Sequence, residues 1–242
     1  MRLLILHTFA YLLIGLTSWV CALITPLRWW DLGLSLSFYP EWDKVLYHPW
    51  SLVTYALPHL NFFHFFGNMC LVYALLPMMA YRLGTRRFLW TYIGGIFAGA
   101  LTYLLGYQLL GAQIIPPLSL QGASAAILSV CAAAVMVDRK ILSSFTLRFT
   151  GNRIPPIALW GFLFLVFLGA GRGNLGGHLA HLGGLLFGIA CGLYYRKQAK
   201  RLASVFTSDR EELLRKTRHS SFSSLSPEER RRLMKNLPKD KN

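Results

Sequence analysis

The stretch Gln121-Gly122-Ala123-Ser124-Ala125-Ala126 places a single hydroxyl among small residues at the start of an apolar segment. Serine is common in membrane helices, where it usually bonds its own backbone or packs against a neighbouring helix. Taken alone, Ser124 is therefore interpreted as a packing residue. A further role depends on where the other polar residues of the apolar segments lie.

The composition indicates a membrane protein. Charged residues make up 14% of the chain and hydrophobic residues 54%, whereas soluble domains carry about 25% charged residues. The hydrophobic residues cluster into runs near the ~20 residues that cross a bilayer. The net charge of +15 does not predict a nucleic-acid partner, because 14 of the 25 Lys and Arg residues follow Tyr195 and most others lie between apolar runs. Such asymmetry is typical of the cytoplasmic side of a membrane protein.

We therefore predict an all-α, polytopic fold in the lipid bilayer, with residues 1–195 as the membrane domain and 196–242 as a basic cytoplasmic tail. The first apolar run, about 23 residues long, exceeds the h-region of a signal peptide. The predicted transmembrane spans are Leu3–Thr25, Pro58–Ala80, Phe88–Leu110, Gly122–Val137, Pro156–Gly169 and Gly176–Tyr195. In the tail, Ser226-Pro227 predicts the start of a short helix, Glu228–Asn236. The basic tail could contact anionic lipid or remain a solvated charge run.

The connections between the spans predict their orientation. The loops around Arg86 and Lys140 and the tail are basic, whereas the loops around Pro116 and Asn174 carry no and one positive charge, respectively. The basic side is therefore expected in the cytoplasm, which gives six spans and a cytoplasmic N-terminus. The Trp- and Tyr-rich connection Pro26–Leu57 is expected at the lipid–water boundary, and His7 near the membrane interface.

With this orientation, the second, fourth and sixth spans all run inward and carry their polar residues near their outer ends. Ser124 and His181 are expected at a similar depth below those ends, from the helical rise per residue. His64 lies at a similar depth and Asn68 one turn deeper, on the same helix face. Polar residues at membrane depth are costly and suggest function.

The residue types narrow the chemistry. No Asp or Glu lies inside an apolar run, which excludes proton relays built on carboxylates, and no HExxH zinc-protease motif is present. Only one pair among the spacings His59/His64 and His178/His181 suits a helix face, so a metal site is disfavoured. Cys21, Cys70, Cys131 and Cys191 have unrelated spacings and predict neither a disulfide framework nor a zinc site. A serine and a histidine at one depth suit nucleophilic catalysis.

Three motifs resemble the rhomboid family of intramembrane serine proteases, of the bacterial six-span type. They are His59-Leu-Asn-Phe-Phe-His64-Phe-Phe-Gly-Asn68, Gly122-Ala-Ser124-Ala125, and Ala180-His181-Leu-Gly-Gly184 with Gly188. The resemblance implies Ser124 as nucleophile and His181 as general base. It implies His64, Asn68 and the Ser124 N–H as oxyanion donors, and His59 as an organiser of the first loop and cavity. Gly184 and Gly188 would let the sixth span press against the fourth.

The chain departs from the family pattern in three places. Ala125 follows the serine where the family usually has glycine, and Leu128 stands where many members have an aromatic residue that stacks on the catalytic imidazole. The first loop carries Trp50-Ser51 where members often have Trp-Arg. His178 matches no family role and is interpreted as solvated or lining the cavity.

The resemblance implies an endopeptidase that cleaves transmembrane segments of other membrane proteins, with no cofactor and no metal. The alternative is a non-catalytic scaffold that binds transmembrane clients. A channel or transporter is disfavoured, since no inverted repeat or pair of broken helices is visible. A small six-span chain fits a bacterial plasma membrane best.

Overall fold

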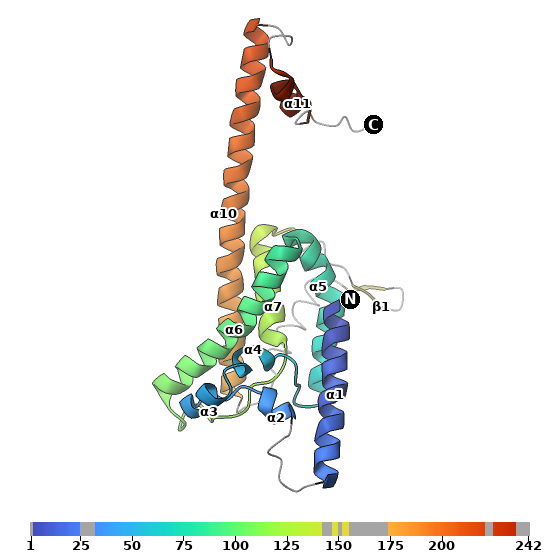
Figure 1. The fold of residues 1–242 in the computed structure, drawn as a ribbon, viewed down its shortest axis with the longest axis vertical. Helices are drawn as coiled ribbons and strands as arrows, with labels where there is room; N and C mark the ends of the chain where they lie inside the picture. Colours follow the sequence, from blue (N-terminus) through green and yellow to red (C-terminus); the bar gives the residue numbers. More distant parts are fainter. Residues whose placement is uncertain are drawn as a thin grey trace. The chain divides into compact units, whose positions relative to one another are not determined.

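The computed structural model describes residues 2–24, 32–141, 147–149, 152–154, 174–220 and 225–235 (Figure 1). The chain divides into two compact units, Met1–Leu193 and Tyr194–Asn242. Four of the described helices contain segments long and apolar enough to cross a membrane: Arg2–Val20, Phe62–Leu83, Thr85–Leu110 and Leu175–Thr217. These helices agree with the prediction of a helical membrane protein. The predicted fifth span, Pro156–Gly169, lies outside the described residues.

The first two long helices of the bundle are α1 (Arg2–Ile24) and α5 (Phe62–Leu83). α5 begins four residues later than the predicted second span, because Asn61 caps it. The Asn61 side chain accepts a hydrogen bond from the backbone N–H of His64 at 2.9 Å, which satisfies one of the N–H groups left open in the first helical turn. His59 therefore precedes the helix instead of lying within it.

A single residue, Gly84, separates α5 from α6 (Thr85–Leu110). Its φ of 77° lies in the left-handed region, which glycine adopts at little cost. The predicted loop around Arg86 is therefore helical except at Gly84. The chain therefore reverses its direction sharply at Gly84, with the last residue of α5 and the first residue of α6 on either side of it.

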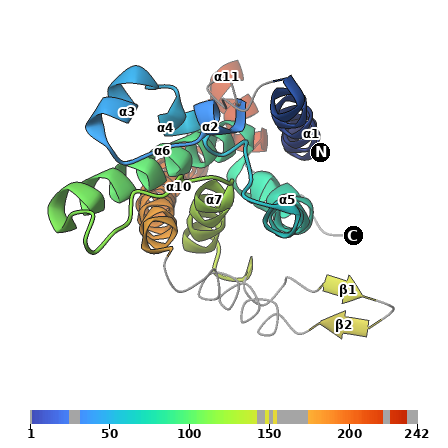
Figure 2. The ribbon, with the colours of Figure 1, turned by 90° about the horizontal axis from the view of Figure 1, so that it is seen from below.

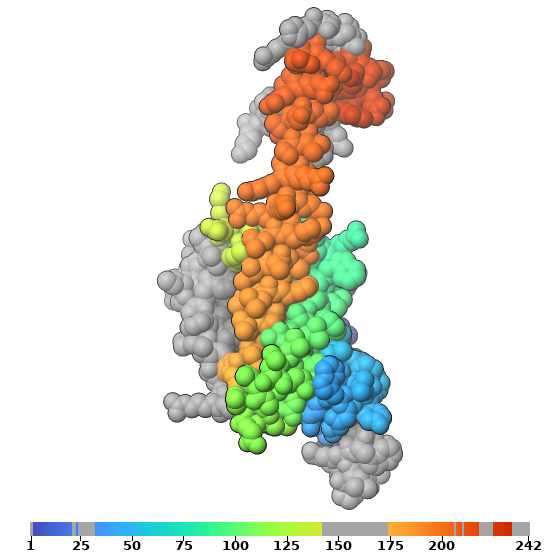
Figure 3. Space-filling model, turned by 90° about the vertical axis from the view of Figure 1, so that its left-hand side faces the viewer, coloured from blue at the N-terminus to red at the C-terminus, as the bar shows by residue number. Residues whose placement is uncertain are grey.

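The long first connection contains three short helices, α2 (Leu32–Leu36), α3 (Trp42–Tyr47) and α4 (Ser51–Thr54). Figure 3 shows these elements, in blue, beside the second half of α6, in green. Phe38 and Leu120 exchange two backbone hydrogen bonds, at 3.2 and 2.7 Å. Gln108 in α6 donates to the carbonyl of Pro40 at 3.0 Å. The connection is thus attached to the bundle at several points.

Several large side chains of this connection remain exposed: Trp42, Leu46, Tyr47 and Trp50. Exposed Trp and Tyr are the residues that favour the headgroup level of a bilayer. The location of this connection at the lipid–water boundary stays a prediction.

α7 (Ser124–Val137) lies between α5 and the first part of α10 (Figure 2). Small residues let its neighbours approach. A side chain at Gly95 of α6 would overlap with Ser129 of α7, and one at Gly99 would lie 2.7 Å from the Tyr55 hydroxyl. Gly95 and Gly99, four residues apart in α6, thus leave room for close packing at this interface.

Two three-residue strands depart from the all-α prediction. β1 (Leu147–Phe149) and β2 (Asn152–Ile154) pair antiparallel in the connection that follows α7, with Leu147 opposite Ile154. The hairpin is too short to change the fold class, and the described residues are otherwise helical or irregular.

α10 (Leu175–Ser220) is far longer than the predicted sixth span, which ended at Tyr195. The helix continues because residues 196–220 contain no Gly or Pro and are rich in Lys, Arg, Leu and Glu, all good helix formers. The hydrophobicity of the sequence falls after Tyr195, which predicted where the helix leaves the membrane. This fall does not predict where the helix itself ends.

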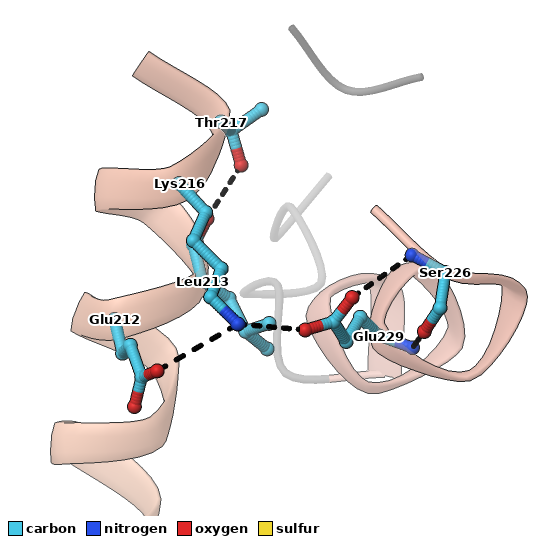
Figure 4. Close-up of polar contacts among 6 residues, drawn as sticks. All are labelled: Glu212, Leu213, Lys216, Thr217, Ser226 and Glu229. Atoms are coloured by element: carbon cyan, nitrogen blue, oxygen red, sulfur yellow. Dashed lines mark hydrogen bonds and ion pairs between the residues drawn. The ribbon is translucent and has the colours of Figure 1, made fainter. Parts of the chain in front are cut away.

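The second unit has its own small core. α11 (Pro227–Lys235) begins one residue before the predicted helix, and Leu213, Leu225 and Leu233 are buried together with Leu214 packed against them. Figure 4 shows Glu229 accepting a hydrogen bond from the Ser226 N–H at 2.9 Å and from Lys216 at 2.9 Å. Because the Ser226 hydroxyl in turn accepts from the Glu229 N–H at 3.2 Å, the helix starts with a complete capping box.

Candidate active site

Ser124 and His181 meet at the interface of α7 and α10. The Ser124 Oγ lies 2.7 Å from the His181 Nε2, a hydrogen-bond distance between residues 57 positions apart. Ser124 is the first residue of α7, and both side chains are half-buried. A hydroxyl in direct contact with an imidazole nitrogen is the arrangement in which a base can accept the hydroxyl proton.

The two helices come close because glycines face the α7 backbone. A Cβ at Gly184 would overlap with the Ala125 carbonyl, and a Cβ at Gly188 would overlap with the Ser129 carbonyl. Both glycines lie on the C-terminal side of His181, at one and two further turns of α10. The absence of their side chains fixes the helix separation at which His181 reaches Ser124.

Gly122 lies two residues before Ser124 and contacts α5. Its φ is 103°, and a Cβ built there would lie 2.8 Å from the His64 Nε2 and 3.7 Å from the Asn68 Nδ2. The Gly122 N–H donates to the Tyr55 carbonyl at 2.8 Å. The structure therefore brings the side chains of His64 and Asn68 to the segment that leads into Ser124.

Asn68 is buried and bonded to its own helix. Its Nδ2 donates to the His64 carbonyl at 2.9 Å, and its Oδ1 has no hydrogen-bond partner among the described residues. An amide nitrogen carries two donors, so one N–H of Asn68 remains available for another acceptor.

The N-terminus of α7 adds backbone donors. No side chain caps it, since Ala123 occupies the cap position. The first N–H groups of a helix have no partner within the helix, and they carry the positive end of its dipole. Ser124 thus presents its own N–H beside its hydroxyl, as an oxyanion site requires.

His59 and His178 lie next to the residues above. His59 is buried, its Nδ1 lies 3.0 Å from the Leu57 carbonyl, and its ring centre lies 5.3 Å from that of His64. His178 is half-buried, one turn before His181, with ring centres 6.4 Å apart. His59 therefore lies beside the His64 ring, and His178 lies beside the His181 ring.

The departure at Ala125 has a structural counterpart in α6. Ala125 is buried, and its Cβ lies 3.0 Å from the position that a Cβ on Gly99 would take. The extra methyl is therefore directed at α6, where Gly99 accommodates it. Leu128 is half-buried on the same helix.

Two residues near the site were missed by the sequence reasoning. His7 was expected near the membrane interface, but it is 1% exposed and lies 2.8 Å, Nε2 to OH, from Tyr92. Its location at the membrane interface stays a prediction, whereas its contact with Tyr92, 85 residues away in α6, was not foreseen. The sequence signal that could have identified this contact was a histidine in an apolar run, because a buried imidazole needs a hydrogen-bond partner.

No metal cluster accompanies these histidines. Within the described ranges, no group of three or more His, Cys, Asp or Glu residues is arranged to hold a metal ion.

Comparison with protein families gives one match. The model of the Rhomboid domain matches residues 47–198, more than half of the chain. The matched segment contains α5, α6 and α7, with Ser124, His181, His64 and Asn68. A search of curated proteins returned no match.

Proposed function

The chain belongs to the rhomboid family, and from this membership we propose that it is an intramembrane serine endopeptidase that cleaves transmembrane segments of other membrane proteins. The observation that carries the proposal is the 2.7 Å contact between the Ser124 Oγ and the His181 Nε2. It joins the two side chains needed for a serine nucleophile and its base, on helices that belong to the matched domain.

In this mechanism His181 accepts the Ser124 proton as the hydroxyl oxygen attacks the scissile carbonyl carbon. The carbonyl oxygen becomes an oxyanion, and the imidazolium then gives its proton to the leaving amine as the peptide bond breaks. The acyl-enzyme ester is hydrolysed by a water molecule that His181 deprotonates in turn. No acid lies in the apolar runs, so the catalytic unit is a dyad.

The oxyanion would be held by donors from two helices. The Ser124 N–H comes from α7, whereas the His64 ring and the Asn68 amide come from α5 and lie next to Gly122. Each such donor is worth roughly 10²- to 10³-fold in kcat in related chemistry. The three donors therefore supply a large part of the expected acceleration.

The substrate must be locally unwound. A helical segment hides its carbonyls in its own hydrogen bonds, and an unpaired backbone in lipid is costly. Small or helix-breaking residues near the cleaved bond would lower that cost, and they are the expected feature of substrates.

The proposed topology has six spans, a cytoplasmic N-terminus and a membrane domain of residues 1–195, with residues 196–242 as a cytoplasmic tail. The basic loops around Arg86 and Lys140 support it. The dyad would then face the outer half of the membrane. We place the protein in a bacterial plasma membrane.

Labelling with a fluorescent fluorophosphonate in detergent tests the proposal. Wild-type protein should be labelled, whereas Ser124→Ala and His181→Ala should not. Ser129→Ala is a matched control, since it removes a hydroxyl of the same helix that donates to the Thr91 carbonyl; it should retain labelling. Folded wild-type protein that stays unlabelled and leaves a transmembrane substrate intact would favour the client-binding scaffold.

A further inference from the structure

His7 is an exception on its helix. Among the side chains of α1 that the structure describes, only His7 and Ala10 are buried. Most other side chains of the helix are apolar, and many of them are exposed, as expected for a surface that faces lipid. Burial of an imidazole costs free energy unless its polar atoms find partners, so this one inward-facing polar side chain calls for an explanation.

Tyr92 of α6 supplies one partner. Its hydroxyl lies 2.8 Å from the His7 Nε2, and Tyr92 is itself only 4% exposed. This contact is a buried hydrogen bond between two helices far apart in sequence. It fixes where the His7 ring lies relative to α6.

The other side of the His7 ring faces His59. The two ring centres are 6.1 Å apart and the planes are nearly perpendicular, at 83°. His59 is in turn edge-on to His64, at 5.3 Å and 66°. We call the series Tyr92, His7, His59 and His64 the ring column.

The orientation of His59 is further restricted. Its Nδ1 must donate to the Leu57 carbonyl at 3.0 Å, because a carbonyl oxygen only accepts. Tyr11 and Phe65 stack on each other at 4.1 Å, and both meet the His59 ring edge-on. These contacts restrict the orientation of the His59 ring, and its other ring neighbours are His7 and His64.

The His64 ring has no comparable anchor of its own. No hydrogen bond joins that ring to any residue in the described part of the chain. It lies between Gly122, where a Cβ would be 2.7 Å from its Cε1, and the His59 ring. Its orientation is therefore set by packing, and the packing on one side depends on the ring column.

We propose that His7 and Tyr92 are positioning residues, which hold the His64 ring in place for oxyanion stabilisation through His59. The inference rests on the proposed function and deepens it. It assigns to α1 a part in the proposed reaction. Neither residue belongs to the motifs from which the site was predicted.

Kinetics with a transmembrane substrate test the proposal. Tyr92→Phe removes one hydroxyl and should lower kcat about 3- to 10-fold, in line with the loss of one hydrogen bond, while KM stays unchanged. His7→Phe should lower kcat about tenfold by the same argument. Tyr73→Phe is the matched control, because its side chain is 66% exposed on α5; its kcat should equal that of the wild type.

A double-mutant cycle separates positioning from simple destabilisation. In a His64→Ala background, Tyr92→Phe should cause no further loss of kcat, since its effect passes through the missing ring. Independent, multiplying losses would overturn the proposal, as would wild-type kcat in both Tyr92→Phe and His7→Phe. If His7→Phe does not fold, the Tyr92→Phe cycle decides alone. Unreactive wild-type protein would instead reject the proposed function, and this inference with it.

Discussion

Gly184 of α10 lies directly against the backbone carbonyl of Ala125 in α7, so that no side chain fits between the two helices at this point. The contact is adjacent to the dyad on both helices, one residue after Ser124 and three after His181. The separation of the Ser124 and His181 side chains is therefore set by backbone packing.

Gly184→Ala should push the helices apart. Overpacking costs about 1–3 kcal/mol of stability, and displacement of reacting groups by about 1 Å can lower the rate by ~10². We expect a lower melting temperature and at least about a tenfold loss of fluorophosphonate labelling rate. Gly15→Ala in α1 is the control, because a Cβ there meets nothing within 4 Å. Equal labelling of both variants would show that the contact does not set the dyad geometry.

Asn68→Ala should lower turnover by about 10², the typical effect of losing one oxyanion donor. The variant leaves the His64 carbonyl without its 2.9 Å side-chain donor, although that carbonyl keeps its helical hydrogen bond. The melting temperature should therefore fall little. Steady-state cleavage and thermal unfolding, measured on the same preparation, check both statements. A rate equal to wild type would remove Asn68 from the site.

Gly122→Ala should displace His64, because the new methyl would lie 2.7 to 2.8 Å from its ring atoms. The φ of 103° adds backbone strain at the same time. Gly111→Ala separates the two effects, since its φ is 76° and a Cβ there meets nothing within 4 Å. We expect both variants to lose stability, and only Gly122→Ala to lose about tenfold or more in kcat, as for a misplaced oxyanion donor. Similar kcat values would attribute the effect to strain alone.

The tail should loosen in acid. Hydrogen bonds that the carboxylate accepts from Lys216 and from the Ser226 N–H lower the pKa of Glu229 from 4.5 to about 2. A folded-state pKa below the unfolded value means that Glu229 stabilises the tail above about pH 4.5, and that this contribution is lost as the pH falls toward about 2. Amide exchange of residues 227–235, corrected for intrinsic rates, should show lower protection at pH 3 than at pH 6.

Variants assign this acid response to one carboxylate. Glu229→Gln should lower protection at pH 6 and weaken the pH dependence. Glu228→Gln should do neither, because Glu228 is exposed and its ion pair among the described residues lies along its own helix, with Arg232 at 3.0 Å. A full acid response in Glu229→Gln would point to another group.

The long apolar helices could be predicted, as could the proximity of Ser124 and His181. The length of the apolar runs, the charge asymmetry of the loops and the helical rise per residue can all be read from local sequence. Helix ends were less predictable. Because Asn61 caps α5, the helix starts four residues after the predicted start, and Gly84 alone separates α5 from α6. α10 runs on to Ser220 because polar residues with high helix propensity continue it without a break.

The ring column could not be predicted for a different reason. His7 is buried because Tyr92 offers a hydroxyl, and neither residue carries a signal that identifies the other. The pairing of Phe38 with Leu120 is likewise non-local. Contacts of this kind depend on the finished arrangement of the helices, which an apolar pattern does not encode.

Tyr55 connects the first loop to two parts of the bundle, because its hydroxyl donates to the Ile96 carbonyl and its own carbonyl accepts from Gly122, both at 2.8 Å. Lifting the loop would break these two hydrogen bonds, the Phe38–Leu120 pair and the bond from Gln108 to the Pro40 carbonyl. The backbone amides of Gly122 and Leu120 should therefore be among the slowest to exchange in the protein. Under the proposed function, entry of a substrate past this loop would therefore require the release of these hydrogen bonds first.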